Sequence, residues 1–336
     1  MKLYRILPLL AVLIGLGGCA KKPDVVIYCS LDKTFSESFL EQFQKDTGLR
    51  VRAQYDTEAV KTVGLTNTLI AEKDNPRADI FWNNELANTV KLVNLGMVEP
   101  YQSPNAETIP AEWKDPDGHW TGFAARARVL IVNTDLVTEA ETPKSMMDLL
   151  DPKWKGKCGI AKPLAGTTFT HFTALPLVIG EEPFTSFLNG LRRNEVHVAT
   201  GNAHIMRLVS RGELHWGFTD TDDFNVALDD GMPVRKVYPD QAEGEPGTMV
   251  IPNSVVMIKG GPNPENAKIL IDYILRPETE KILAASRSAQ IPLHPGVERP
   301  DHVKSPGHFR AMIVDYDEVG KRLDASNDRL TKEFNR

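Results

Sequence analysis

Segments typical of buried strands alternate along this chain with segments typical of amphipathic helices, and the alternation restricts the possible folds more than any other feature. VVIYCS (25–30) has the apolar run of a strand, and 35–48 places four apolar residues at helical spacing before Gly48. LRVRAQY (49–55) is strand-like again. A strand, a helix and a strand in this order predict a parallel βαβ unit.

The same pattern continues to the C-terminal third of the chain. It predicts further strands at 78–83, 128–134, 157–163, 196–201, 214–219 and 253–260, and helices at 60–73, 85–96, 145–150, 202–212 and 264–275. The fold class is therefore α/β. Because 336 residues exceed what one core usually organises, we expect two lobes, joined by short crossovers because no Gly/Ser linker is present.

The N-terminus has the layout of a secretory signal. Lys2 and Arg5 precede an apolar run from 6 to 16 that is too short to span a membrane. Leu16-Gly17-Gly18-Cys19 is similar to a bacterial lipobox, so we expect cleavage after residue 18 and a lipid on Cys19. The protein is expected to work outside the cytoplasm as a membrane-anchored lipoprotein, in the periplasm or on the outer face of the cell membrane.

Charge and cysteine content narrow the function classes. The chain has 39 Lys+Arg against 45 Asp+Glu, and loss of Lys2 and Arg5 moves the net charge from -6 to -8. A mildly acidic chain argues against nucleic acid as a partner. Cys29 and Cys158 have no metal-ligand spacing, and we interpret both as structural.

The stretch TDTDDF (219–224) carries three carboxylates within four residues, between a strand-like and a helix-like segment. Two interpretations stand side by side. Acids at a helix start cap the helix and complement its dipole. The carboxyl ends of strands are also where α/β proteins hold ligands.

Several runs together resemble the ferric-binding family of extracytoplasmic solute-binding proteins, the capture subunits of ABC importers. They cover nearly the whole mature chain in order: 25–51, 77–101, 125–136, 151–168 and 214–228, with DPKWKGK (151–157) as the most specific marker. The resemblance implies two α/β lobes, each a mostly parallel sheet flanked by helices, joined by two hinge strands. It also implies a ligand held in the cleft between the lobes, and members of sister groups bind ferric ion, hexose phosphates or phosphonates.

The order in which chains of this family cross between the two lobes gives the expected domains of this chain. They are a signal peptide (1–18), a lipidated tether (19–23), lobe one (24–125 and 251–300) and lobe two (126–250 and 301–336, the latter a helical segment).

The positions that hold iron in the family carry other residues here. The histidine position is Asp32, the glutamate position is Asn84, with Glu85 beside it, and the two adjacent tyrosines are Asp222 and Asp223. Carboxylates suit hard cations, so Asp32, Asp222 and Asp223 could form an all-oxygen metal site. They could equally hold an ammonium group or the hydroxyls of a polyol.

The anion side of the family site is better preserved. Arg126 and the loop Gly166-Thr167-Thr168 match the places that hold a synergistic anion, and a guanidinium with a helix N-terminus suits carbonate, carboxylate or phosphate. The alternative is a surface ion pair and an ordinary cap. Arg128, two residues on, is expected to help or to pair with an acid.

A further candidate is Asp56-Thr57-Glu58, at a strand-to-helix junction. Thr57 and Glu58 are predicted to face the ligand, with a plain helix cap as the alternative.

The sequence thus predicts a solute-binding protein that captures Fe3+ with an anion and delivers it to an ABC permease and ATPase. The alternative ligand is an anionic organic solute such as a phosphonate or sugar phosphate, and a divalent cation is a third. An enzyme using the Asp cluster is the alternative from another class, although the chain has no nucleophile elbow, P-loop or dinucleotide fingerprint. We expect a monomer that meets the membrane through its lipid and has no other cofactor.

Overall fold

The computed structural model describes residues 22–56 and 63–335 of the chain. The predicted signal peptide and lipidation site Cys19, and the ligand candidates Thr57 and Glu58, lie outside the described residues. None of the helices within the described ranges is both long and apolar enough to cross a membrane.

The first βαβ unit forms as the sequence predicts. β1 (Val25–Cys29) and β2 (Val51–Tyr55) pair in parallel, and α1 (Lys33–Thr47) connects them. Helix α1 buries Phe39, Leu40 and Phe43, and it ends at Gly48, whose φ of 75° favours glycine. The elements that follow before the long central strand are α2 (Val63–Ala71), β3 (Ile80–Asn83), α3 (Ala87–Asn94) and β4 (Val98–Glu99).

The remaining elements continue the alternation. They are β5 (Thr121–Asn133), β6 (Cys158–Ala161), α4 (Gly166–Ile179), α5 (Glu181–Arg193), β7 (His197–Ala199), α6 (Asn202–Ser210), β8 (Trp216–Asp220), α7 (Thr221–Asp229), β9 (Val234–Val237), β10 (Val250–Ile258), α8 (Pro264–Ile274), α9 (Pro277–Ala285) and α10 (Tyr316–Phe334). One predicted helix differs: 145–150 forms a 3-10 helix, η4 (Met146–Leu150), whose start is fixed by a capping box between Ser145 and Asp148.

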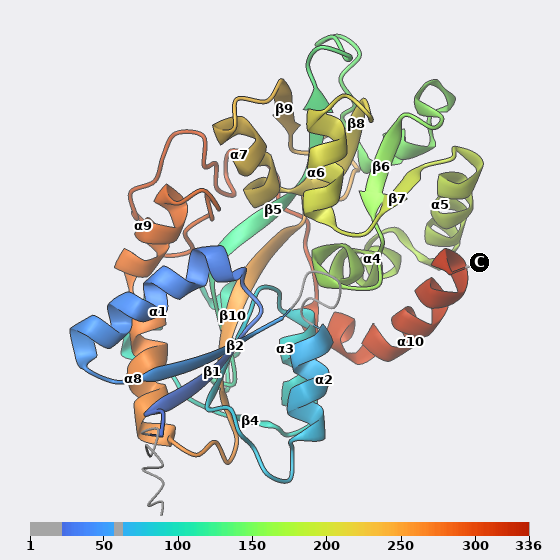
Figure 1. The fold of residues 1–336 in the computed structure, drawn as a ribbon. Coiled ribbons are helices and arrows are strands. Elements are labelled where there is room, and N and C mark those ends of the chain that lie inside the picture. The colour runs from blue at the N-terminus through green and yellow to red at the C-terminus, as the bar shows by residue number, and fades with distance from the viewer. Residues whose placement is uncertain (1–21, 57–62, 336) are drawn as a thin grey trace, which may run out of the picture.

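The strands form one curled sheet in the order β2-β1-β3-β10-β5-β8-β6-β7, with β4 added to β10 and β9 added to β5. β5 and β10 are fully buried and antiparallel, and they run diagonally through the centre of the molecule (Figure 1). Helices α1, α2, α3 and α8 lie around one end of these two strands, and α4, α5, α6 and α7 lie around the other (Figure 1).

β5 is irregular near its start, between Phe123 and Arg126. Ala124 has a φ of 43°, and the register with β10 shifts between Ile251 and Asn253. The buried carboxylate of Glu280 accepts a hydrogen bond from Ala124 N (2.6 Å). These contacts fix the local backbone of β5, and therefore the direction in which the side chain of Arg126, two residues later, points away from the strand.

The two cysteines within the described ranges are free and buried. Burial raises the pKa of each thiol, Cys29 and Cys158, to about 12. Their thiols are therefore inert packing groups, as the sequence suggests.

Candidate functional site

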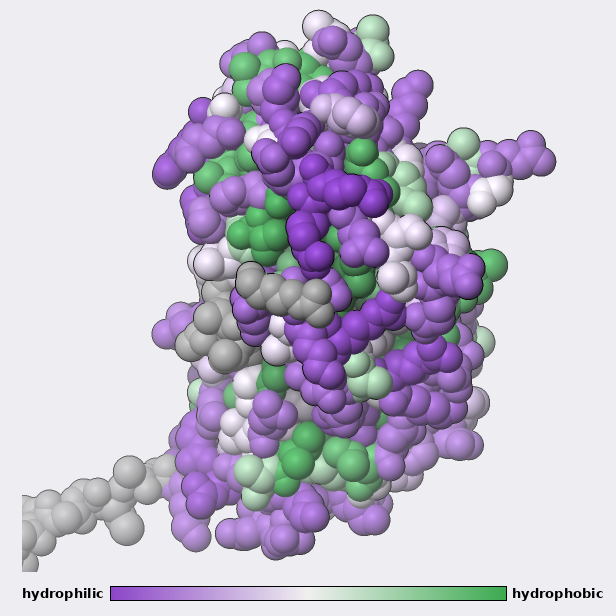
Figure 2. Space-filling view, turned by 90° about the vertical axis from the view of Figure 1, so that its right-hand side faces the viewer, coloured by the Kyte–Doolittle hydropathy of each residue, from purple (hydrophilic) through white to green (hydrophobic). Residues whose placement is uncertain are grey.

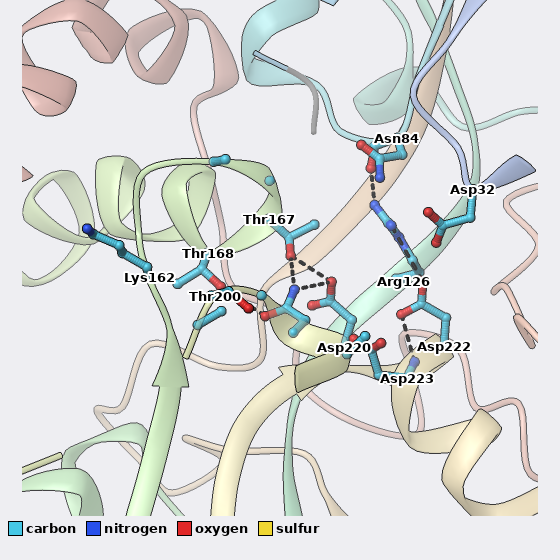
Figure 3. Close-up of a pocket in the computed structure, with 16 residues that line it drawn as sticks. Asp32, Asn84, Arg126, Lys162, Thr167, Thr168, Thr200, Asp220, Asp222 and Asp223 are labelled. Atoms are coloured by element: carbon cyan, nitrogen blue, oxygen red, sulfur yellow. Dashed lines mark hydrogen bonds and ion pairs between the residues drawn. The ribbon is translucent and has the colours of Figure 1, made fainter. Parts of the chain in front are cut away.

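The carboxyl ends of five strands open onto one pocket (Figure 3). Parallel strands and their following helices bring polar loop residues together at this edge of a sheet. The pocket has a volume of about 60 Å³. Its lining residues are Asp32, Asn84, Arg126, Ala161, Lys162, Ala165, Gly166, Thr167, Thr168, Thr200, Gly201, Asn202, Ala203, Asp220, Asp222 and Asp223.

One side of the pocket is made by two helix N-termini. α4 starts after Ala165 and α6 after Gly201, and neither residue has a side chain that caps its helix. The first backbone bond of α4 is that of Phe169 N to Ala165 O, so the N–H groups of Gly166, Thr167 and Thr168 precede it. Free N–H groups at the positive end of a helix suit an anion.

Arg128 lies beneath these helix starts and is fully buried. Its Nη1 donates to Asp220 Oδ1 (2.6 Å) and to Thr167 Oγ1 (3.1 Å), and its Nη2 donates to Thr168 Oγ1 (3.0 Å). Its guanidinium also lies 4.4 Å from the centre of the Phe218 ring. Of the two roles expected for Arg128, the structure therefore shows pairing with an acid.

Asn202 closes this network. Its Nδ2 donates to Thr167 Oγ1 (2.8 Å) and Asp220 Oδ2 (3.1 Å), while its Oδ1 accepts from Arg128 (3.2 Å) and Thr168 (3.1 Å). The network joins the starts of α4 and α6 to the end of β8. It holds this side of the pocket in one geometry.

The protonation state of Asp220 follows from the same contacts. Burial alone would raise the pKa of this carboxyl, but the guanidiniums of Arg128 and Arg126 and the hydrogen bond from Thr167 outweigh it. The pKa of Asp220 therefore lies below its ordinary value. Asp220 is a carboxylate at neutral pH and stays paired with Arg128.

Arg126 lies at the centre of the pocket and is only 2% exposed. Its Nη2 donates to the main-chain oxygen of Asn84, and its Nη1 lies 3.6 Å from Asp222 Oδ2. Within the described ranges no atom accepts from its Nε. Burial opposes the charge, but Asp222 and the neighbouring carboxylates raise the pKa of Arg126, so it remains a cation.

The contacts of the acids in TDTDDF bear on both the cap interpretation and the ligand interpretation. Asp220 occupies the cap position of α7 but makes no capping bond, because its side chain turns to Arg128. Asp222 Oδ1 accepts from Asp223 N (3.0 Å), and Asp223 Oδ2 accepts from Thr219 Oγ1 (2.8 Å). Asp220, Asp222 and Asp223 each place a carboxylate oxygen within 4.8 Å of the others. Asp222 and Asp223 thus lie in the first turn of α7, where acids complement the helix dipole, and they also line the pocket, so both interpretations remain open.

Asp32 and Asn84 reach the pocket from the opposite side, after β1 and β3 (Figure 3). Glu85, the neighbour of Asn84, does not line the pocket. Its carboxylate accepts from Ala87 N (2.5 Å) and Asn88 N (2.9 Å) at the start of α3, and from Thr170 Oγ1 (3.0 Å).

The structure thus brings together eight of the predicted ligand residues, namely Asp32, Asn84, Arg126, Gly166, Thr167, Thr168, Asp222 and Asp223. Thr167 and Thr168 bond to Arg128, whereas Arg126 contacts Asn84 and Asp222. The compact carboxylate group contains Asp220 in place of Asp32.

Sequence reasoning missed Asp220 and Asn202. Asp220 is one of the three acids of TDTDDF, but the family resemblance selects only Asp222 and Asp223 as ligand positions. Asn202 stands where the predicted strand 196–201 is followed by a predicted helix, and the strand-end rule that selected Asp56-Thr57-Glu58 selects it as well.

Comparison with known proteins places the chain among binding proteins. Residues 76–321 match the model of a family described as bacterial extracellular solute-binding protein. The chain is 27% identical over 330 residues to iron uptake protein A1 of Synechocystis sp., covering 92% of this chain and 89% of that protein. It is 26% identical over 318 residues to a putative 2-aminoethylphosphonate-binding periplasmic protein of Salmonella typhimurium, covering 90% and 88%.

A solved structure gives the same fold. The periplasmic binding protein AfuA of Actinobacillus pleuropneumoniae, with fructose-6-phosphate bound, superimposes with a TM-score of 0.82 at 23% identity, over 93% of this chain and 98% of that one. This agreement confirms the α/β, two-lobed fold class predicted from the sequence.

Proposed function

The chain belongs to the family of bacterial extracellular solute-binding proteins, and from that premise we propose that it captures a small organic solute that carries an anionic group at one end and an ammonium group at the other. The relatives with described roles are binding and uptake proteins. Their names span two kinds of ligand, iron and an aminophosphonate, so the choice between them rests on the pocket.

The observation that carries the proposal is the separation of charge across the pocket. The N-termini of α4 and α6, with Thr167 and Thr168, line one end of the pocket, while Asp32, Asp222 and Asp223 line the other end, where Arg126 lies between Asn84 and Asp222 (Figure 3). A phosphonate or carboxylate suits the helix N-termini and an ammonium group suits the carboxylates. The relative named for 2-aminoethylphosphonate supports a ligand of this shape.

Ferric ion with an anion is the second candidate. The oxygens of Asp220, Asp222 and Asp223 within 4.8 Å of one another favour it, and oxygen donors suit a hard cation. Against it, Arg128 lies 2.6 Å from Asp220 and Arg126 lies 3.6 Å from Asp222. A trivalent cation would have to compete with both guanidiniums for these carboxylates.

We further propose the setting in which this capture takes place. The protein is held outside the cytoplasm by lipid on Cys19 and hands its ligand to an ABC permease with its ATPase. Lobe one comprises 24–125 and 251–300, and lobe two comprises 126–250 and 301–336. The monomer is the working unit.

Calorimetry with defined probes tests the ligand class. The protein, purified without chelator and then dialysed against EDTA, is titrated with 2-aminoethylphosphonate, with ethylphosphonate, and with Fe3+ plus carbonate. We expect tight binding of the first and at least tenfold weaker binding of the second, which lacks the ammonium group. Binding of Fe3+ alone among the three would replace the proposal by the second candidate.

Arg126→Ala should weaken binding of 2-aminoethylphosphonate by about 1.5–3 kcal/mol, the range for hydrogen bonds to charged groups. The reason is that Arg126 is a buried cation in the pocket, with its Nε directed at no described acceptor. Lys155→Ala, which removes an exposed cation paired with Glu195, serves as the control and should leave the affinity unchanged. Equal affinities of Arg126→Ala and wild type would remove Arg126 from the site.

Ligand contacts on both sides of the pocket should favour a closed arrangement of the lobes, since differential contacts shift populations. We expect the radius of gyration in small-angle scattering to fall when 2-aminoethylphosphonate saturates the protein. An unchanged scattering curve at saturation would contradict closure.

A further inference from the structure

The C-terminal helix α10 touches helices from both sides of the pocket, although it lies away from the pocket itself (Figure 1). On one side it meets α3. A β-carbon added to Gly320 would lie 2.6 Å from Val90 Cγ1, so a larger residue at 320 requires a local shift between the two helices. The polar link on this side is the pair Lys91 Nζ to Asp324 Oδ1 (2.6 Å).

The second half of α10 is held differently, against α4 and α5. The Phe334 ring packs on Phe172 with centroids 6.3 Å apart, and Arg329 Nη1 lies 2.8 Å from Glu181 Oε2. Arg192 and Glu333 form another pair at 2.5 Å. Hydrophilic side chains cover much of this face of the molecule (Figure 2).

The two helices that α10 connects both begin at the pocket. α3 starts just after Asn84, and α4 starts with Gly166. Near these starts Thr170 of α4 donates to Glu85 (3.0 Å), whose carboxylate also caps α3. A change in the angle between α3 and α4 therefore changes the width of the pocket, and both helices meet α10 farther along.

We propose that α10 is a brace fixed to α4 and α5, and that its contact with α3 at Gly320 and Val90 is the joint at which the pocket opens and closes. The polar link at the joint is weak, because Asp324 is 85% exposed and surface pairs contribute about 1 kcal/mol or less. Packed helices can slide past one another over small distances, which is the geometry of a shear joint. This inference rests on the proposed function, since a joint matters only where closure captures a ligand.

A disulfide across the joint provides the test. The β-carbon of a residue at 320 would lie 3.0 Å from Val90 Cβ, slightly below the usual disulfide range, so Val90→Cys with Gly320→Cys can be cross-linked after a small shift. We expect the oxidised double variant to release 2-aminoethylphosphonate at least tenfold more slowly than its reduced form. Amide hydrogen exchange at Ala87 and Asn88, measured without ligand, should slow by a similar factor.

Two controls keep the outcome clear. Val90→Cys alone should behave as wild type under oxidation, because the native thiols of Cys29 and Cys158 are buried. Asp324→Lys places a like charge beside Lys91 without altering the packed surface, and it should speed exchange at the same amides severalfold.

The experiment distinguishes failure of the proposed function from failure of the proposed brace. If wild type binds none of the phosphonate or iron probes, the proposed function fails. Hydrogen exchange of the ligand-free double variant, oxidised against reduced, then still tests whether the contact between α10 and α3 is a joint. If the cross-link changes neither exchange nor release, α10 is not the brace we propose.

Discussion

Arg128→Ala is expected to destabilise the fold by about 3–5 kcal/mol, the cost of leaving one member of a buried ion pair without its partner. Arg128 is fully buried and lies 2.6 Å from Asp220, which is itself 3% exposed. The loss would also leave the hydroxyls of Thr167 and Thr168 without the donor that aligns them. Equilibrium unfolding in urea, followed by tryptophan fluorescence, measures the change.

Two further variants separate this effect from a general loss of charge. Arg192→Ala removes a guanidinium that is 54% exposed, and it should cost about 1 kcal/mol or less. Arg128→Ala combined with Asp220→Asn should recover a large part of the loss, because no buried charge then remains unpaired. A single variant Arg128→Ala as stable as wild type would contradict the account of this network.

The same pair predicts a pH dependence. In wild type the pKa of Asp220 is lowered, so its contribution to stability is present above the ordinary value of 3.8 and is lost as the pH falls through the folded-state pKa. Without Arg128, burial of Asp220 dominates and its pKa rises. The difference in unfolding free energy between wild type and Arg128→Ala should therefore shrink as the pH falls from 7 towards 4.

The double variant Asp222→Asn with Asp223→Asn should lose most of its binding of 2-aminoethylphosphonate while melting as high as wild type or higher. Asparagine keeps the side-chain oxygens that accept from Asp223 N and Thr219 Oγ1, so the start of α7 should remain intact. Removal of two charges that lie within 4.8 Å of each other and of Asp220 relieves repulsion in the empty pocket. This gain offsets the loss of Asp222 as the partner of buried Arg126, which keeps the carboxylates of Asp220 and Asp32 nearby. Two charge-assisted bonds at about 1.5–3 kcal/mol each correspond to a loss of affinity of a hundredfold or more.

Asp229→Asn with Asp230→Asn is a matched control at the other end of α7. These acids are exposed and lie near Arg287. Their replacement should leave affinity unchanged, because neither lines the pocket. If Asp222→Asn with Asp223→Asn lowers the melting temperature and keeps the affinity, the acids of TDTDDF are a helix start and nothing more.

Much of the fold could be predicted because its signals are local. A few neighbouring residues determine each of these signals, namely the end of α1 at Gly48, the apolar spacing of α1 and the strand-to-helix junctions. Most of the predicted pocket residues came from the family resemblance, and the structure shows that β1, β3, β6, β7 and β8 each end in a polar loop that contributes to the pocket.

The partners of the two arginines could not be predicted from the same signals. Arg126 and Arg128 are two residues apart and share one strand face. Which of them meets Thr167 depends on the positive φ of Ala124 and on the register of β5 against β10 and β8, which are long-range properties. Asn202 was missed for a related reason, because its importance comes from four partners distant in sequence.

The unequal division of the pocket has a kinetic consequence. Among the described lining residues, Asp32 and Asn84 are the ones that precede β5, whereas the helix starts, the hydroxyls and the other carboxylates all follow it. A solute can therefore make most of its contacts on one surface first, and the encounter rate should depend on α4, α6 and α7. Asp32 and Asn84 contact the solute only after it has bound to that surface. Substitutions at these two positions should leave the association rate nearly constant and shorten the residence time.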